Sequence, residues 1–323
     1  MELKGSSMEV KSQEAIGSAA STAEPVSVLL RNLIDYAGLF PPASLGIAPA
    51  VANYYLYSRS EFRWMLGRFI VPAARLSEFG AVLVRLPGSG AESQSRWGVS
   101  ALLGADVADD LARIHDFNRC GIVGRPPTEK IESVEVRVTS PEEIERLSRI
   151  IPPELETYFE IPSTGEATPD CVAAVASCRR RAKIRTGGET PDKFPAPESV
   201  LDFIALCAAA GVPFKATAGL HHPLRSLRRL TYQPDSPSGV MHGFLNVFLA
   251  AALVRAGMET GLALELLKEQ AVEAFQFGSD EIIWRGHRLG ARDVSLARRD
   301  FAISFGSCSF TEPIEDLRIL HLL

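Results

Sequence analysis

Two lysines stand inside segments that have the composition of buried strands. Lys183 lies in Ala-Lys-Ile-Arg-Thr-Gly-Gly at 182–188, and Lys215 lies in Pro-Phe-Lys-Ala-Thr-Ala-Gly at 213–219. The chain has only seven lysines beside 27 arginines, so lysine is not its ordinary surface cation. A lysine amine becomes nucleophilic when burial or a neighbouring cation disfavours its protonated form. The pair therefore predicts Schiff-base chemistry on a carbonyl substrate.

The elements that must position these lysines alternate between short apolar strands and helices from Leu29 onward. Such alternation favours a parallel sheet with helical crossovers, and eight strands suggest an α/β fold closed into a (β/α)8 TIM barrel. An open, doubly wound sheet is the alternative. The expected strands are 31–37, 68–73, 99–104, 131–138, 156–162, 182–187, 213–219 and 301–306.

Local signals mark the ends of two crossover helices. Ser140-Pro141-Glu142-Glu143 offers an N-cap, a proline at the first helical position and a glutamate at the third. Gly211 is placed to end a helix built on 200–210, because glycine readily adopts the left-handed conformation found after helix ends. Both signals agree with the alternation of strands and helices.

One domain, one tail and one insertion account for the rest of the chain. Residues 1–25 are rich in Ser, Ala, Glu and Gly and predict a mobile N-terminal tail, which leaves 26–323 as a single barrel domain. An insertion at about 222–298 separates the seventh and eighth strands. Within it we expect a loop over 223–238 and helices over 243–258 and 261–277, which would form a lid, contact a second copy in a homo-oligomer or pack on the barrel wall.

The composition points to a small-molecule partner. A net charge of −5 and a pI of about 5.8 give no general attraction to nucleic acid or to an anionic membrane. The longest apolar stretch, 243–256, is too short to span a bilayer. The five cysteines are an odd number without CxxC spacing, which favours reduced thiols. We therefore expect a cytoplasmic protein that binds a small carbonyl compound and needs no cofactor.

Alternation along strands four to seven separates an apolar face from a polar one, because successive side chains point to opposite sides. The polar face contains Ser133, Glu135, Arg137, Tyr158, Glu160, Lys183, Arg185, Lys215, Thr217 and Gly219. A barrel interior is normally filled by branched apolar residues, and catalytic groups cluster at the carboxyl ends of its strands. The charged face therefore predicts an active site. A salt-bridged lining without chemistry is the alternative, because buried charges are tolerated when paired.

Five motifs in this order resemble those of the deoxyribose-phosphate aldolases, which are class I aldolases on a (β/α)8 barrel. Segment 33–39 (Leu-Ile-Asp-Tyr-Ala-Gly-Leu) is similar to the first-strand Ile-Asp-His-Thr-x-Leu motif, and 159–161 (Phe-Glu-Ile) to the Ile-Glu-Thr motif of the fifth strand. Segment 183–187 matches Lys-x-x-Thr-Gly of the sixth strand, and 215–219 resembles Lys-Ala-x-Gly-Gly of the seventh. Segment 306–309 (Gly-Ser-Cys-Ser) resembles the Gly-Thr-Ser-Ser phosphate loop.

The chain departs from that family at several positions. Glu135 stands where the family has an aspartate, Tyr36 replaces the first-strand histidine, and Arg185 stands two residues after Lys183. The insertion before the last strand is a further difference. These departures concern the substrate more than the fold.

The resemblance implies a role for each polar residue. Lys183 would form the Schiff base, and the cations Lys215 and Arg185 would help to keep its amine deprotonated. Glu135 or Glu160 would move protons, and Asp35 would orient a lysine or a hydroxyl. A phosphate or carboxylate of the substrate would be bound by residues drawn from Arg137, Arg185, Thr186, Gly187, Thr217, Gly219, His221, His222, Gly306, Ser307 and Ser309.

Two other functions fit the same residues. His221, His222 and His242 could hold a metal ion together with Glu160, which would make the protein a metal-dependent hydrolase or lyase, although HxH and HExxH spacings are absent from the sequence. A barrel without catalytic activity that binds an anionic metabolite is the other possibility. It predicts stabilisation by the ligand without turnover.

Overall fold

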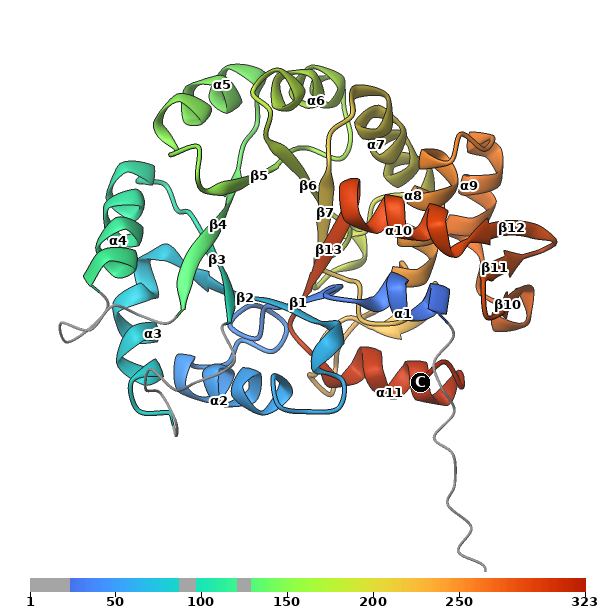
Figure 1. Ribbon diagram of the computed structural model, residues 1–323, viewed down its shortest axis with the longest axis horizontal. Helices are drawn as coiled ribbons and strands as arrows, with labels where there is room; N and C mark the ends of the chain where they lie inside the picture. Colours follow the sequence, from blue (N-terminus) through green and yellow to red (C-terminus); the bar gives the residue numbers. More distant parts are fainter. Residues whose placement is uncertain (1–23, 87–96, 121–128) are drawn as a thin grey trace, which may run out of the picture.

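The computed structural model describes residues 24–86, 97–120 and 129–323 and has the predicted closed barrel. Eight parallel strands close in the order β1-β13-β7-β6-β5-β4-β3-β2. Helices surround this barrel on the outside (Figure 1). The open doubly wound sheet is therefore wrong, and the chain has the α/β fold of a TIM barrel. The predicted tail lies outside the described residues up to 23, and residues 24 and 25 already belong to the first helix.

The barrel strands lie within a few residues of their predicted positions. They are β1 (Ile34–Tyr36), β2 (Leu66–Pro72), β3 (Gly98–Leu102), β4 (Lys130–Arg137), β5 (Glu156–Glu160), β6 (Arg181–Arg185), β7 (Phe214–Thr217) and β13 (Ala302–Ser307). Five further strands lie between β7 and β13, namely β8 (Ser226–Arg229), β9 (Ser238–Met241), β10 (Phe275–Phe277), β11 (Glu281–Trp284) and β12 (His287–Gly290).

The helices fill the crossovers and the insertion. They are α1 (Glu24–Leu30), α2 (Ile47–Tyr57), α3 (Leu76–Leu83), α4 (Val107–Cys120), α5 (Pro141–Ile150), α6 (Ala167–Ser177), α7 (Pro197–Ala210), α8 (Phe244–Arg255), α9 (Thr260–Lys268), α10 (Ala291–Asp300) and α11 (Thr311–Ile319). Short 3-10 turns are η1 (Arg63–Met65), η2 (Ala73–Arg75), η3 (Pro191–Lys193) and η4 (Val272–Ala274). None of the helices in the described part of the chain combines the length and hydropathy needed to cross a membrane.

Both predicted helix signals are confirmed. Ser140 accepts a hydrogen bond from the backbone N–H of Glu143, and Pro141 occupies the first position of α5. Gly211 ends α7 with a φ of 65°, a conformation that costs a residue with a Cβ more than it costs glycine. These caps fix where two of the crossovers turn back toward the barrel.

The predicted division of the strands into two faces is also confirmed. Val134 and Val136 on β4, and Ala182 and Ile184 on β6, are fully buried or nearly so on the helix-facing side. On the other side, the barrel interior contains buried polar groups contributed by most of its strands: Asp35, Ser100, Ser133, Glu135, Tyr158, Glu160, Lys183, Lys215 and Ser304. The interior of this barrel is therefore polar where branched apolar residues are usual.

The insertion contains more strand structure than the sequence predicted. The expected loop over 223–238 includes β8, which pairs with β9 as an antiparallel hairpin. A second antiparallel sheet, in the order β10-β11-β12, was missed altogether. Its tight turn places Arg285 and Gly286 at positive φ, as a two-residue hairpin turn requires, but Arg-Gly is a weak sequence signal for such a turn.

The helix predicted over 261–277 is too long, because α9 ends at Lys268. The buried carboxylate of Glu269 explains the end. Its Oε1 accepts hydrogen bonds from the backbone N–H groups of Gln270 and Ala271, which compete with continuation of the helix. Its Oε2 accepts from Trp284 and Arg285, so the same residue attaches the helix end to the small sheet.

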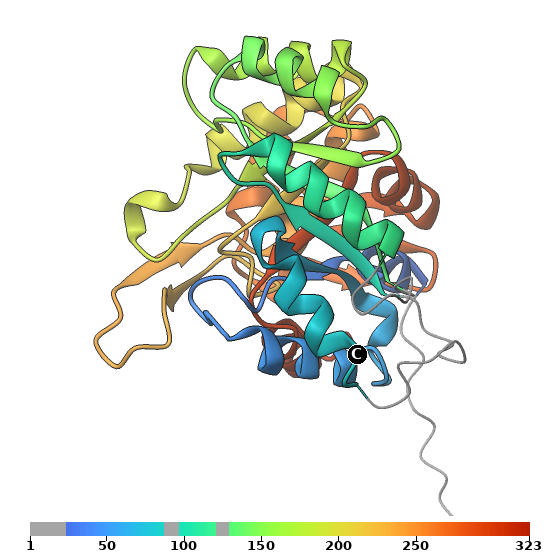
Figure 2. The same cartoon turned by 90° about the vertical axis from the view of Figure 1, so that its left-hand side faces the viewer.

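The loops that follow the barrel strands gather at one end of the barrel. Figure 2 shows the β8–β9 hairpin, the loop containing η3 and the loop after β1 projecting on the same side. In a TIM barrel the carboxyl ends of the strands form the face that holds the active site. This end is where the charged interior residues meet the loops.

Candidate active site

The register of the sheet brings the predicted charged side chains to one level of the barrel. Lys183 pairs with Glu160 on β5 and with Lys215 on β7. Arg137 pairs with Glu160 in the same way. Since paired residues of a parallel sheet point to the same side, these four side chains share the inner face.

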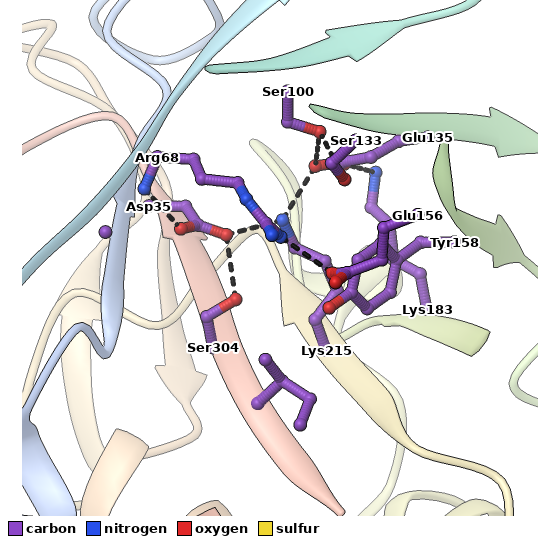
Figure 3. Close-up of polar contacts among 12 residues, drawn as sticks. Asp35, Arg68, Ser100, Ser133, Glu135, Glu156, Tyr158, Lys183, Lys215 and Ser304 are labelled. Carbon is purple, nitrogen blue, oxygen red and sulfur yellow. Dashed lines mark hydrogen bonds and ion pairs between the residues drawn. The ribbon is translucent and has the colours of Figure 1, made fainter. Parts of the chain in front are cut away.

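A buried carboxylate joins the two lysines (Figure 3). Glu135 lies with Oε1 2.7 Å from the Nζ of Lys215 and Oε2 2.8 Å from the Nζ of Lys183. Lys183 also lies 2.8 Å from Oε2 of Glu160, and Lys215 lies 2.5 Å from Oδ2 of Asp35. The lysines are 4% and 1% exposed, respectively, so each amine has two carboxylates and almost no water.

Hydroxyl and amide donors hold these carboxylates in place. Ser100 donates to Oε1 of Glu135, and Ser304 donates to Oδ2 of Asp35. The other oxygen of Asp35 accepts from the backbone N–H of Arg68. The sequence reasoning missed all three, although Ser100 and Ser304 could have been found by reading the third and eighth strands with the same period of two.

The charges of this cluster balance. Asp35, Glu135 and Glu160 supply three negative charges against the two lysines, and Arg185 supplies the third positive charge with its Nε 3.0 Å from Oε1 of Glu160. The Arg185 side chain is 47% exposed, unlike the other members. The cluster therefore extends from the barrel centre to its open end, and Arg185 is the member that a solute can reach first.

The ion pairs outweigh burial in setting the charge of the carboxylates. Burial alone raises the pKa of Glu135 and of Glu160. The ammonium of Lys183 has the opposite effect and lowers both pKa values below the usual range. Lys215 adds to this effect at Glu135, and Arg185 adds to it at Glu160. Burial likewise lowers the pKa of Lys215, but Asp35 and Glu135 raise it above the usual range. Both carboxylates and Lys215 are therefore ionised at neutral pH.

These shifts predict a loss of stability in acid. Groups whose folded pKa is depressed contribute stability above their unfolded pKa of about 4.3, and this contribution disappears as pH falls from about 5 through the folded value. The free energy of unfolding should fall between neutral pH and about pH 3. We expect Glu135→Gln to make that fall smaller by on the order of 2 kcal/mol. Urea unfolding across this range measures the change. Glu132→Gln, on an exposed residue of the same strand, should leave the pH dependence as it is, and equal curves for both variants would contradict the assignment.

A cavity of about 560 Å³ opens above the cluster. Its charged residues are Glu135, Arg137, Glu160, Lys183, Arg185, Lys193 and Lys215, with Glu189 near the rim. Its apolar wall comes partly from Phe40, Pro41 and Pro42 in the loop after β1 and from Leu230 and Met241 in and beside the hairpin. This size and mixture of polar and apolar groups suit a small molecule.

The remaining predicted ligand-binding residues divide into those that line the cavity and those that do not, and His222 belongs to the second group. Gly187, Thr217, Gly219, His221 and Gly306 line the cavity. The hydroxyl of Thr186 instead donates to the carbonyl of Ala218, and that of Ser307 accepts from the backbone N–H of Ser309. Ser309 itself accepts from the backbone N–H of Glu312 at the start of α11. None of these three residues lines the cavity, so the structure does not bring their hydroxyls to it as anion donors.

Gly187 and Gly219 have a packing reason to be glycine. A Cβ on Gly187 would lie 2.9 Å from the Cα of Gly219, and a Cβ on Gly219 would meet Gly187 at the same distance. Both would also collide with the ring of Phe194. The close approach of the two strand ends therefore requires these glycines, whether or not their amides bind an anion.

The three histidines of the metal hypothesis point to different partners. Nδ1 of His221 lies 2.8 Å from Glu312, and Nδ1 of His222 lies 2.7 Å from Asp316. Nε2 of His242 lies 2.8 Å from the carbonyl of Pro195. Within the described ranges no group of three or more His, Cys, Asp and Glu side chains could hold a metal ion. The metal-dependent alternative gains no support from this arrangement.

Sequence reasoning also missed a second polar group on the wall of the cavity. Cys308, which follows β13, lies beside His221, and Tyr232 on the tip of the hairpin reaches both Cys308 and Glu312. The histidine was predicted as a ligand donor, but Cys308 and Glu312 lie 87 and 91 residues after it in the sequence. No motif spacing links them.

In comparisons with family models, curated proteins and solved structures, nothing matches this chain. The resemblance to deoxyribose-phosphate aldolases therefore stays a prediction that rests on the five motifs. The fold and the geometry of the buried lysine–carboxylate cluster are the observations on which a function can be argued.

Proposed function

We propose that the protein is a class I aldolase-type lyase in which Lys183 forms a Schiff base with a small aldehyde or ketone. The observation that supports this most is the position of Lys183, buried at the floor of the cavity between Glu135 and Glu160. Lys215 suits the nucleophile less well, because it is enclosed by Asp35, Glu135 and the ring of Tyr158.

The carboxylates favour the covalent intermediate. An ammonium group and a carbonyl compound give a protonated imine and water, so the lysine nitrogen carries one positive charge both before the reaction and in the covalent intermediate. Charges fixed in advance stabilise such an intermediate without reorganisation. The two carboxylates that neutralise the Lys183 ammonium neutralise the iminium equally well. They act as its counter-ions while the iminium withdraws electrons from the adjacent carbon–carbon bond.

A proton must leave the amine before it attacks, and Glu160 is the better acceptor. Glu135 already accepts from both lysines and from Ser100. Glu160 is bound by Lys183 and by Arg185, whose side chain is half exposed. A phosphate or carboxylate on the substrate would draw Arg185 away and free an oxygen of Glu160 to take the proton. The substrate class proposed is therefore a carbonyl compound with an anionic group.

Reductive trapping tests the proposal. The protein is incubated with borohydride and a panel of small aldehydes, ketones and keto acids, and the modified peptide is located by mass spectrometry. We expect an adduct on Lys183 and a loss of at least about tenfold in trapping for Lys183→Met. Lys193→Met is the matched control, because Lys193 lines the same cavity but is exposed and pairs with the exposed Asp192. Equal trapping in both variants, or none with any carbonyl compound, excludes the covalent role.

A barrel that binds an anionic metabolite without turnover remains the second candidate, since Arg137 and Arg185 line the same cavity. It predicts thermal stabilisation by anions that Lys183→Met retains and Arg185→Gln loses. Trapping on Lys183 would decide against it.

A further inference from the structure

A thiol and an imidazole line the cavity where β7 and β13 end, and a carboxylate of α11 contacts the imidazole. Sγ of Cys308 lies 3.9 Å from Nε2 of His221, and Nδ1 of His221 lies 2.8 Å from Oε2 of Glu312. This is the order of nucleophile, base and orienting group that activates a thiol. Cys308 and His221 both line the cavity.

The surroundings of Cys308 differ from those of the chain's core cysteines. Cys171 and Cys207 are buried in helices α6 and α7 among apolar groups, and burial raises the pKa of both thiols. Cys308 instead contacts the imidazole of His221 and, at 3.7 Å, the hydroxyl of Tyr232. Tyr232 also donates to Glu312, so the hairpin helps to fix the carboxylate that holds the histidine.

The groups around Cys308 place a protonated imidazole beside the thiol. Burial alone would lower the pKa of His221, but hydrogen bonds with Cys308 and Glu312 outweigh it and raise the pKa to about 10. Burial raises the pKa of Glu312, but His221 and Tyr232 lower it overall. The phenol of Tyr36, which interacts electrostatically with Cys308, is neutral because burial raises its pKa to about 12. An imidazolium next to a thiol stabilises its thiolate.

We propose that Cys308 and His221 form a thiolate–imidazolium pair, oriented by Glu312, which is a second nucleophilic centre in the cavity and adds reversibly to aldehydes. In the forward step the sulfur–carbon bond forms, the carbonyl π bond opens, and the carbonyl oxygen takes the proton from Nε2 of His221. The product is a hemithioacetal, and the reverse step returns the proton to the imidazole. No oxidant or reductant is needed.

This centre does not depend on the Schiff base, because none of its three residues belongs to the lysine–carboxylate cluster. It lies in the same cavity, two strands away from Lys183 in the order β6-β7-β13. An aldehyde bound there would be held close to the site where Lys183 is proposed to act.

Ultraviolet absorbance of the thiolate tests the proposal on the full chain. All samples contain Lys183→Met, so that no adduct on that lysine interferes. A free cysteine is only a few per cent thiolate at neutral pH. The spectrum with Cys308 minus that of Cys308→Ala should show on the order of tenfold more thiolate than this. Adding His221→Asn should reduce the difference to the level of a free thiol.

Propanal tests the second half of the proposal in the same samples. Addition to the aldehyde consumes the thiolate, so the Cys308-dependent absorbance should fall with increasing propanal and return on dilution. The Cys308→Ala protein should not respond. Absence of a Cys308-dependent thiolate band at neutral pH, persistence of the band in His221→Asn, or a band that propanal leaves unchanged would each overturn the proposal. Failure of trapping on Lys183 would leave these results unaffected.

Discussion

Glu135→Ala is expected to lower the free energy of unfolding by about 3 to 5 kcal/mol, the range for removing one partner of a buried ion pair. The carboxylate is 2% exposed and contacts the amines of both Lys183 and Lys215. Without it each lysine keeps one carboxylate, and the balanced cluster gains a net positive charge in a region that water barely reaches. Urea unfolding at neutral pH, analysed for midpoint and slope, measures the loss.

Two further variants separate charge from shape. Glu135→Gln keeps the volume and an acceptor oxygen but removes the charge, so it should show most of the loss seen in Glu135→Ala. Glu132→Ala changes an exposed carboxylate on the same strand and should stay within about 0.5 kcal/mol of the parent. A loss below about 1 kcal/mol for Glu135→Ala would mean that the amines find other counter-charges, and the cluster would not have the role given to it here.

The barrel could be predicted from the sequence because its signals are local. The apolar alternation of each strand, the cap at Ser140 and the glycine at 211 all act over a few neighbouring residues, and these elements appear where expected. The errors lie in the insertion, where tertiary contacts decide the local structure. Glu269 ends α9 through bonds to Trp284 and Arg285, and a sequence window around 269 contains neither partner.

The members of the lysine cluster could be predicted, but their contacts could not. Period-2 alternation placed Glu135, Glu160, Lys183 and Lys215 on the inner face, and all four are there. The sequence suggested that Lys215 and Arg185 act on Lys183 as neighbouring cations. In the structure a shared carboxylate separates each of them from Lys183, Glu135 for Lys215 and Glu160 for Arg185. Spacing along the chain carries no information about which carboxylate lies between two amines.

The contacts among Cys308, His221 and Glu312 were even harder to predict from the sequence. His221 precedes Cys308 by 87 residues and Glu312 by 91; the histidine follows β7, whereas the thiol and the carboxylate follow β13. Their meeting depends on β13 lying beside β7, which is known only once the barrel closes. Residue types alone offered a lone cysteine, a histidine after a strand and a glutamate in the first turn of a helix.

Lys215→Met is expected to cost about 3 to 5 kcal/mol, and a second change should recover part of that cost. The variant leaves Asp35 and Glu135 without the amine that lies 2.5 Å and 2.7 Å from them. Adding Glu135→Gln removes one negative charge and returns the cluster to charge balance. If charge balance stabilises the cluster, the double variant should be more stable than the sum of the single effects predicts, by about 1 to 3 kcal/mol.

A surface pair provides the matched control for this cycle. Lys268 and Glu198 lie 2.8 Å apart, much as the buried partners do, but both side chains are substantially exposed. Their double-mutant cycle should give less than about 1 kcal/mol, because water screens the pair. Additive losses in the buried cycle would show that packing of the lysine stem stabilises the barrel more than its charge does. Borohydride trapping on the double variant then decides the role of Lys215. A stable protein that still traps carbonyl compounds on Lys183 would assign Lys215 to charge balance. Loss of trapping in the double variant, with trapping retained in Glu135→Gln alone, would place Lys215 in the chemistry.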